Sequence, residues 1–166
     1  MGAAFFCFQT LSFKLSTDFP IRCEDILHAE ESAMPIVAWD VSLSVGNNVI
    51  DEHHRHLIAL LNKAYDEFCD KNSMVAMGPL LEELIDYATY HFAHEEKLMK
   101  ATSYPEAAQH LQEHERFVKR VTEMQKDFVT GDVPFSLELL SFMRNWLVNH
   151  ISKIDTKLGA YASTRH

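Results

Sequence analysis

The chain has 166 residues, of which 47% are hydrophobic and 11% aromatic, so it has enough apolar material for the core of one domain rather than two. Its formal net charge of -9 at pH 7 argues against a nucleic-acid partner, because binding to a phosphate backbone requires clustered lysine and arginine. The acidity mainly indicates solubility.

The cysteines and the apolar runs indicate the compartment. Cys7, Cys23 and Cys69 lack the C-x-x-C spacing of a thiolate zinc site, and their odd number argues against a disulfide framework. A reducing cytoplasm suits them best. No apolar run approaches the roughly 18 residues that a membrane-spanning helix requires, so we expect a soluble protein with no membrane partner.

Residues 1–33 differ from the rest of the chain. They start with an apolar stretch, from Ala3 to Phe8, and show no helical period. That stretch is too short for a signal peptide and follows no basic residue. We expect an N-terminal extension of unknown role, or a start codon set too early with Met34 as the natural beginning. Residues 34–166 are expected to form the functional domain.

From about Asp51 onward, apolar residues recur at alternating spacings of three and four, which predicts amphipathic helices. The first ends near residues 70–73, and its inward stripe is Ile50, His54, Leu57, Leu61, Ala64 and Phe68. The second is expected to begin near Pro79, since proline suits a first helical turn, and its stripe is Leu84, Ala88, His91, Glu95 and Leu98.

Two further helices follow the break at Tyr104-Pro105. The third ends before Gly131, and its stripe is Ala107, His110, His114, Phe117, Val121, Met124 and Phe128. The fourth starts near Pro134 and presents Leu139, Met143, Trp146, His150, Ile154 and Tyr161, with Leu147, Ile151, Asp155 and Leu158 beside them. Short connections then favour an all-α fold, an antiparallel up-down-up-down four-helix bundle with an N-terminal extension.

Seven polar side chains interrupt these apolar stripes, and we call them the donor cluster: His54, His91, Glu95, His110, His114, His150 and Asp155. Residues four apart lie on the same face of an α-helix, so the His91/Glu95 and His110/His114 pairs could each bind metal ions in one place. His150 and Asp155 are about 140° apart on a 3.6-residue turn, close enough to share one wide face. In an antiparallel bundle, the donors of the first three helices lie at one level. The position of the donors in the fourth helix is compatible with the same level.

Imidazole with carboxylate oxygen is a ligand set suited to iron, and seven donors exceed the four of a structural zinc site. Two metal ions are the economical interpretation, because carboxylates can bridge two cations. Five imidazoles, two bridging carboxylates and one shared solvent oxygen then leave one octahedral position open for a small ligand.

A single buried histidine is more often a hydrogen-bonded core residue than a ligand. Burying five imidazoles and two carboxylates without a metal, however, would cost several kcal/mol that a small bundle cannot readily offset. The remaining histidines are interpreted as residues that bind no metal. His53, His56 and His94 fall off the inward stripes and are expected to be solvated, and His28 and His166 lie in segments without helical register.

The pattern resembles the hemerythrins, specifically their bacterial single-domain branch, over roughly residues 35–162. The matching pieces are Ile50-Asp51-Glu52 leading to His54, the string HFAHEEKLM, the His110/His114 pair and the string WLVNHISKID. The resemblance implies two non-haem irons with an oxo or hydroxo bridge. It places His110, His114 and His150 on one iron, His54 and His91 on the other, and Glu95 and Asp155 between them.

The resemblance also implies reversible binding of dioxygen at the iron that carries two histidines, in a dry pocket lined by Trp146, Leu147 and Ile151. These three residues serve equally well as ordinary core. Histidines outnumber carboxylates in the donor cluster, whereas di-iron bundles with Glu-x-x-His motifs surround the metals with more carboxylates. This difference favours binding of dioxygen over oxidation of a substrate.

Several functions stay open within this expectation. An oxygen-binding protein for storage, delivery to an oxygen-consuming enzyme, or sensing comes first. A di-iron peroxidase, oxidase or nitric-oxide-handling enzyme on the same bundle is the alternative, followed by an iron-handling or regulatory protein. The chain shows no evident second apolar face, so a monomer is expected.

Overall fold

The computed structural model describes residues 35–69, 74–129 and 137–165, and helices dominate them. The long helices are α1 (Asn48–Cys69), α2 (Met74–Thr102) and α3 (Ala107–Val129). A fourth helical stretch is composed of α4 (Leu137–His150), the π-helical turn η3 (Ile151–Asp155) and α5 (Thr156–Ser163). A short 3₁₀ turn, η2 (Val41–Leu43), precedes α1, and the described residues contain no strand.

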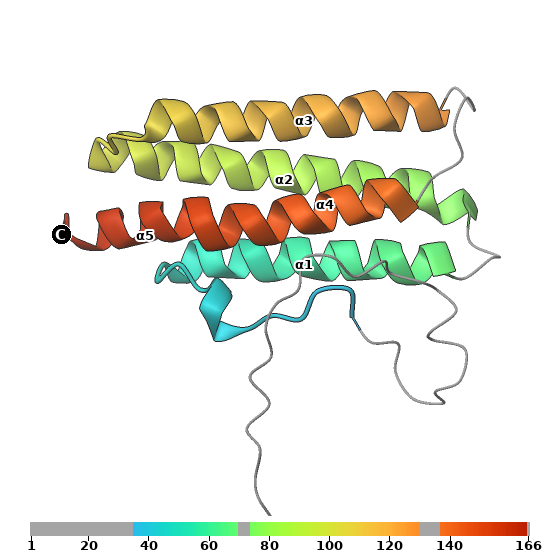
Figure 1. Ribbon diagram of the computed structural model, residues 1–166, viewed down its shortest axis with the longest axis horizontal. Helices are drawn as coiled ribbons and strands as arrows, with labels where there is room; N and C mark the ends of the chain where they lie inside the picture. The colour runs from blue at the N-terminus through green and yellow to red at the C-terminus, as the bar shows by residue number, and fades with distance from the viewer. Residues whose placement is uncertain (1–34, 70–73, 130–136, 166) are drawn as a thin grey trace, which may run out of the picture.

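The helices form an antiparallel four-helix bundle (Figure 1). Each long helix contacts its two neighbours, α1 with α2 and α4, and α3 with α2 and α4. The start of α1, the end of α2, the start of α3 and the C-terminal part of the fourth stretch all lie at one end of the bundle (Figure 1). The expected up-down-up-down all-α fold is therefore confirmed.

Where the described residues test the predicted helix boundaries, the clear difference is in α2. This helix begins at Met74 and contains Pro79 in its interior rather than at its first turn. Extending the helix brings Met77, which is 0% exposed, into the core, and this burial offsets the backbone hydrogen bond that Pro79 cannot donate. The predicted start at Pro134, the predicted stop at Gly131 and the N-terminal extension (1–33) lie outside the described residues.

The core of the bundle is continuous and mostly aliphatic. Its fully buried side chains come from every long helix and include Leu61, Leu81, Val121, Leu140 and Met143. The predicted stripes therefore face inward. None of the described helices combines the length and apolar character needed to cross a membrane.

Residues 35–47, which we call the N-terminal strap, run along the outside of α1 (Figure 1). The side chain of Asn62 holds the strap by accepting a hydrogen bond from the Val37 N–H at 3.0 Å and donating one to the Val37 carbonyl at 2.9 Å. Arg144 of α4 donates to the carbonyl of Ile36 at 2.9 Å. The strap is thus attached to two helices before α1 begins.

Candidate metal centre

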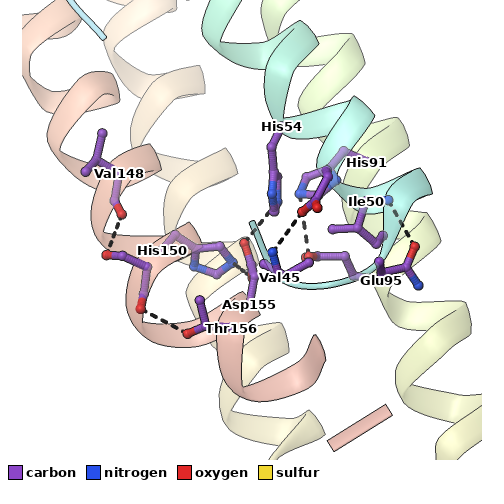
Figure 2. Close-up of polar contacts among 12 residues, drawn as sticks. Val45, Ile50, His54, His91, Glu95, Val148, His150, Asp155 and Thr156 are labelled. Atoms are coloured by element: carbon purple, nitrogen blue, oxygen red, sulfur yellow. Dashed lines mark hydrogen bonds and ion pairs between the residues drawn. The ribbon is translucent and has the colours of Figure 1, made fainter. Parts of the chain in front are cut away.

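The seven residues of the donor cluster meet inside the bundle. Each is at most 3% exposed, although all are polar or charged: His54, His91, Glu95, His110, His114, His150 and Asp155. They come from all four helical stretches, and several of them converge on Asp155 and Glu95 in Figure 2. The structure brings together every residue that the sequence analysis predicted for this cluster.

The donor atoms fall into two groups that share both carboxylates. One ligand atom from each of Glu95, His110, His114, His150 and Asp155 can be chosen so that all lie within 4.8 Å of one another. The same holds for His54, His91, Glu95 and Asp155. A division into three and two histidines, with two carboxylates in common, is therefore built into the packing of the helices.

Each carboxylate lies against imidazoles from other helices. Asp155 Oδ2 is 3.2 Å from His54 Nε2, and Asp155 Oδ1 is 3.1 Å from His110 Nε2 and 3.0 Å from His150 Nε2. Glu95 Oε2 is 3.1 Å from His114 Nε2. Both carboxylates therefore span the space between the two groups of histidines.

The imidazole nitrogens also approach one another. His150 Nε2 lies 3.2 Å from His110 Nε2 and 3.0 Å from His114 Nε2. Neighbouring ligands of an octahedral ion with metal–nitrogen distances of about 2.1 Å are separated by roughly 3 Å, so this spacing is that of nitrogens aimed at one ion. Three imidazoles in this arrangement suit a shared cation better than a hydrogen-bond network.

Hydrogen bonding leaves the centre of the cluster unsatisfied. Both oxygens of Glu95 and both oxygens of Asp155 are buried without a hydrogen-bond partner, as are both ring nitrogens of His54. Buried polar atoms without partners cost about 1–3 kcal/mol each, and more when charged. Metal cations would satisfy these atoms and balance the two negative charges, so the residues fit a pair of ions.

The fourth helical stretch reaches the cluster through a π turn. The N–H of Thr156 donates to the carbonyl of Ile151, five residues earlier, which inserts one extra residue into the turn. Ser152 Oγ donates to the Val148 carbonyl at 2.7 Å, and Thr156 Oγ1 donates to the Ser152 carbonyl at 2.9 Å, as drawn in Figure 2. Such side-chain bonds bend helices.

This turn changes the geometry expected of the fourth helix. A regular α-helix would separate His150 and Asp155 by about 140°. The wider π turn aligns residues five apart, and His150 Nε2 lies 3.0 Å from Asp155 Oδ1. The five-residue spacing in the sequence was the available signal for this turn.

Burial and neighbouring charges shift the pKa values of the cluster in opposite directions. Burial lowers the pKa of His91 to about 4, against the opposing effect of Glu95. Burial also disfavours the charged form of His110, but Asp155 and Glu95 outweigh it and raise its pKa to about 9. Burial would raise the pKa of Asp155, but the adjacent imidazoles, His150 foremost, hold it well below its usual range.

Aromatic rings fix the orientation of the histidines of the larger group. Phe92 stacks on His114 with ring centroids 3.9 Å apart and an interplanar angle of 10°. Trp146 stacks on His150 at 4.2 Å and 15°. Stacking of this kind restricts ring rotation, so these contacts orient the nitrogens before a metal binds. The sequence analysis did not foresee the role of Phe92, whose position beside His91 was the available signal.

One of the remaining histidines differs from its expectation. His53 is 8% exposed and therefore buried, not solvated. It lies between α1 and α2, where its ring contacts Tyr90 and His94 at centroid distances of 5.2 and 4.7 Å. Its neighbours on α2 cover it, which the periodicity of α1 alone could not indicate. His56 is exposed and His94 is half-buried. His28 and His166 lie outside the described residues.

The residues expected to line a small-ligand pocket lie around an apolar cavity. Trp146 and Leu147 line a cavity of about 10 Å³, together with Leu61, Ala88 and Phe117 among others. Ile151 is fully buried but is not part of this lining. The cavity is about the size of one water molecule and its walls are apolar, so it favours a small uncharged guest over water.

The strap packs through η2 against the turn η3, which contains Asp155. Asp51, buried on α1, accepts hydrogen bonds from the Val45 N–H at 2.8 Å and from Ser44 Oγ at 2.5 Å. The Val45 carbonyl thereby packs against Gly159 of α5, one turn after Asp155. Asp51 was part of the motif that carried the resemblance, but its structural role was not predicted.

Comparisons with known proteins agree with this geometry. Residues 45–162 match the family model described as the hemerythrin HHE cation binding domain. A bacteriohemerythrin of Stenotrophomonas maltophilia is 39% identical over 124 residues, covering 74% of this chain and 78% of that protein. A bacteriohemerythrin of Methylococcus capsulatus is 34% identical over 128 residues, covering 76% and 96%.

A solved structure shows the same fold. The crystal structure of a wild-type hemerythrin matches with a TM-score of 0.73 and 31% sequence identity, and the match covers 77% of this chain and 98% of that one. Its shared fold and the clustered histidine, glutamate and aspartate side chains support a non-haem di-iron protein. The chain belongs to the hemerythrin family.

Proposed function

We propose that the chain binds dioxygen reversibly at a non-haem di-iron centre held by the donor cluster, and serves as an oxygen carrier, store or delivery protein. The observation that carries the proposal is the pair of donor groups that share Glu95 and Asp155. We assign this function to residues 34–166 and treat residues 1–33 as an extension.

The ligand assignment follows the two groups. His110, His114 and His150 would hold one iron and His54 and His91 the other, with Glu95 and Asp155 bridging them. Two ferrous ions held by these residues would supply the two electrons that reversible binding of dioxygen requires. The iron with two histidines has fewer protein ligands, so the small ligand would bind there.

The protein's own contribution is a rigid and dry surrounding. All seven donors are at most 3% exposed, and the stacked rings of Phe92 and Trp146 restrain two of the histidines. Excluding water disfavours the charged products of an irreversible oxidation. Trp146 and Leu147 would provide the apolar side of the oxygen pocket, and Ile151 the packing behind it.

The ligand composition supports binding rather than oxidation of a substrate. Five of the seven donors are neutral imidazoles, which give less support to high-valent iron than carboxylates do. The apolar cavity of about 10 Å³ is about the size of one water molecule and has no room for an organic substrate.

Stopped-flow spectroscopy of the diferrous protein mixed with oxygen tests the proposal. A carrier forms a stable charge-transfer band that disappears when oxygen is removed and returns when it is restored. Rapid irreversible oxidation, without a reversible band, would show an enzyme of the same fold instead.

A further inference from the structure

A surface groove of about 420 Å³ opens between α3 and α4, and the metal-ligand candidate His150 forms part of its lining. Its volume falls within the roughly 300–1,000 Å³ of typical small-molecule pockets. Another donor, His110, lines a recess of about 10 Å³, too small for an organic molecule. The groove therefore brings a molecule larger than dioxygen within contact of the donor cluster from outside.

Aromatic rings connect the groove to the cluster. Trp146 is half-buried, lines the groove, and stacks on His150 at 4.2 Å with an interplanar angle of 15°. Phe142, one helical turn earlier, lines the same groove. His150 in turn directs its Nε2 to Asp155 and to the other histidines. A planar ring placed in the groove would be in π contact with a side chain that contacts a metal ligand.

The groove has one charge without an ionic partner among its described contacts. Glu113 is paired with Arg116 at 2.6 Å, whereas the Lys153 ammonium donates to the neutral Asn149 Oδ1 at 2.6 Å. Asn145 Oδ1 accepts from Arg144, which leaves the Asn145 amide N–H groups as donors for a ligand oxygen. Donors on Asn145 and Lys153 beside the rings of Trp146 and Phe142 suit an aromatic ring with oxygen substituents better than a cation.

We propose that the groove binds an uncharged aromatic electron donor of the hydroquinone class and that its electrons reach the metal centre through Trp146 and His150. The proposal rests on the proposed function, because it requires iron in the cluster. Electronic coupling falls steeply with distance, so direct ring contacts give the buried centre its shortest connection to a molecule at the surface.

The reaction balances without any other reactant. The hydroquinone loses two electrons and two protons and becomes a quinone. Two ferric ions held by the donor cluster would accept one electron each, and the protons would pass to water at the open side of the groove. The step converts the oxidised centre to the ferrous form that binds dioxygen, so it would keep a carrier in its working state.

A binding experiment on the metal-free protein tests the groove independently of iron. Trp39 and Trp146 are the two tryptophans of the chain, so a Trp39→Phe background leaves Trp146 as the fluorescent reporter. Duroquinone is a suitable probe because its fully substituted ring does not add to cysteine thiols. We expect saturable quenching of Trp146, weakened about tenfold by Asn145→Phe, which fills the groove. Lys97→Phe, in a separate groove between α2 and α3, is the matched control and should bind normally.

A kinetic experiment on the iron-loaded diferric protein tests the electron path. With duroquinol as donor, we expect the rate of iron reduction to saturate with donor concentration. The ratio of the duroquinol rate to the dithionite rate should be about tenfold lower in Asn145→Phe than in the parent protein. Lys97→Phe should keep the ratio of the parent protein.

The outcomes separate this proposal from the proposed function. Unsaturable quenching, or a duroquinol rate that Asn145→Phe leaves unchanged relative to dithionite, overturns the groove even if oxygen binds reversibly. Saturable binding with the expected variant effects supports the groove even if oxygen oxidises the iron irreversibly.

Discussion

The contact between the strap and α5 gives a sharp prediction for Gly159→Ala. A Cβ added at Gly159 would lie 2.9 Å from the carbonyl carbon of Val45 and closer still to its oxygen. Both neighbours are backbone, and the N–H of Val45 is held by Asp51 at 2.8 Å, so the strap cannot give way freely. Gly78→Ala is the matched control, because nothing lies within 4 Å of the Cβ added there.

The loss of stability depends on how the clash between the added Cβ and Val45 is relieved. Keeping the strap in place costs about 1–3 kcal/mol of overpacking. Releasing it loses the hydrogen bond to Asp51, about 1.5–3 kcal/mol for a charged acceptor, and part of the burial of Val45. Alanine gains about 0.5–1 kcal/mol of helix propensity at Gly159 and less at Gly78, because the following Pro79 crowds the Cβ of a helical residue. The difference between the variants is therefore a lower bound on the cost of the contact. We expect Gly159→Ala to be about 2 kcal/mol less stable than Gly78→Ala.

Urea unfolding followed by far-ultraviolet circular dichroism measures this difference in the free energy of unfolding. Because the strap packs against η3, which contains Asp155, Gly159→Ala should also release iron faster than Gly78→Ala. Equal stabilities of the two variants would show that the strap does not pack against α5 as described.

Three further predictions concern the cluster itself. His91→Ala should abolish oxygen binding while circular dichroism shows the helices retained, since the aliphatic core still packs; normal oxygen binding by this variant would contradict the ligand assignment. In metal-free protein, the pKa of His91 is lowered to about 4, so folding favours its neutral form. The free energy of unfolding should therefore fall by about 3 kcal/mol as the pH drops from above 6.5 toward 4. Urea unfolding across this pH range measures the change. The pKa of His110 is raised to about 9, so folding favours its protonated form. Its imidazole should titrate near pH 9 in NMR spectra of metal-free protein. A midpoint near 6.5 would contradict the contacts with Asp155 and Glu95.

The helical period explains why so much of the cluster could be predicted. A histidine or carboxylate on an apolar stripe must point inward wherever the stripe is buried, and antiparallel helices bring such positions to one level. Glu95 and His114 illustrate this, because each lies four residues from another donor and both are buried. Donor identity and spacing were therefore enough to indicate which side chains meet.

Features that depend on neighbouring helices or on irregular backbone could not be predicted in the same way. His53 is buried because Tyr90 and His94 of α2 cover it, and the period of α1 carries no information about them. The π turn changes the local period itself, so a 3.6-residue projection misplaced Asp155 relative to His150. The position of the strap depends on Asp51, a single polar residue without a repeating pattern.

Iron content measured together with optical spectra tests the central claim most directly. Protein reconstituted with ferrous iron under exclusion of air should hold two iron ions per chain and develop a charge-transfer band when oxygen is admitted. That band should vanish on removal of oxygen and return over repeated cycles. A chain that binds no iron, or a single ion, would contradict the two donor groups joined by Glu95 and Asp155.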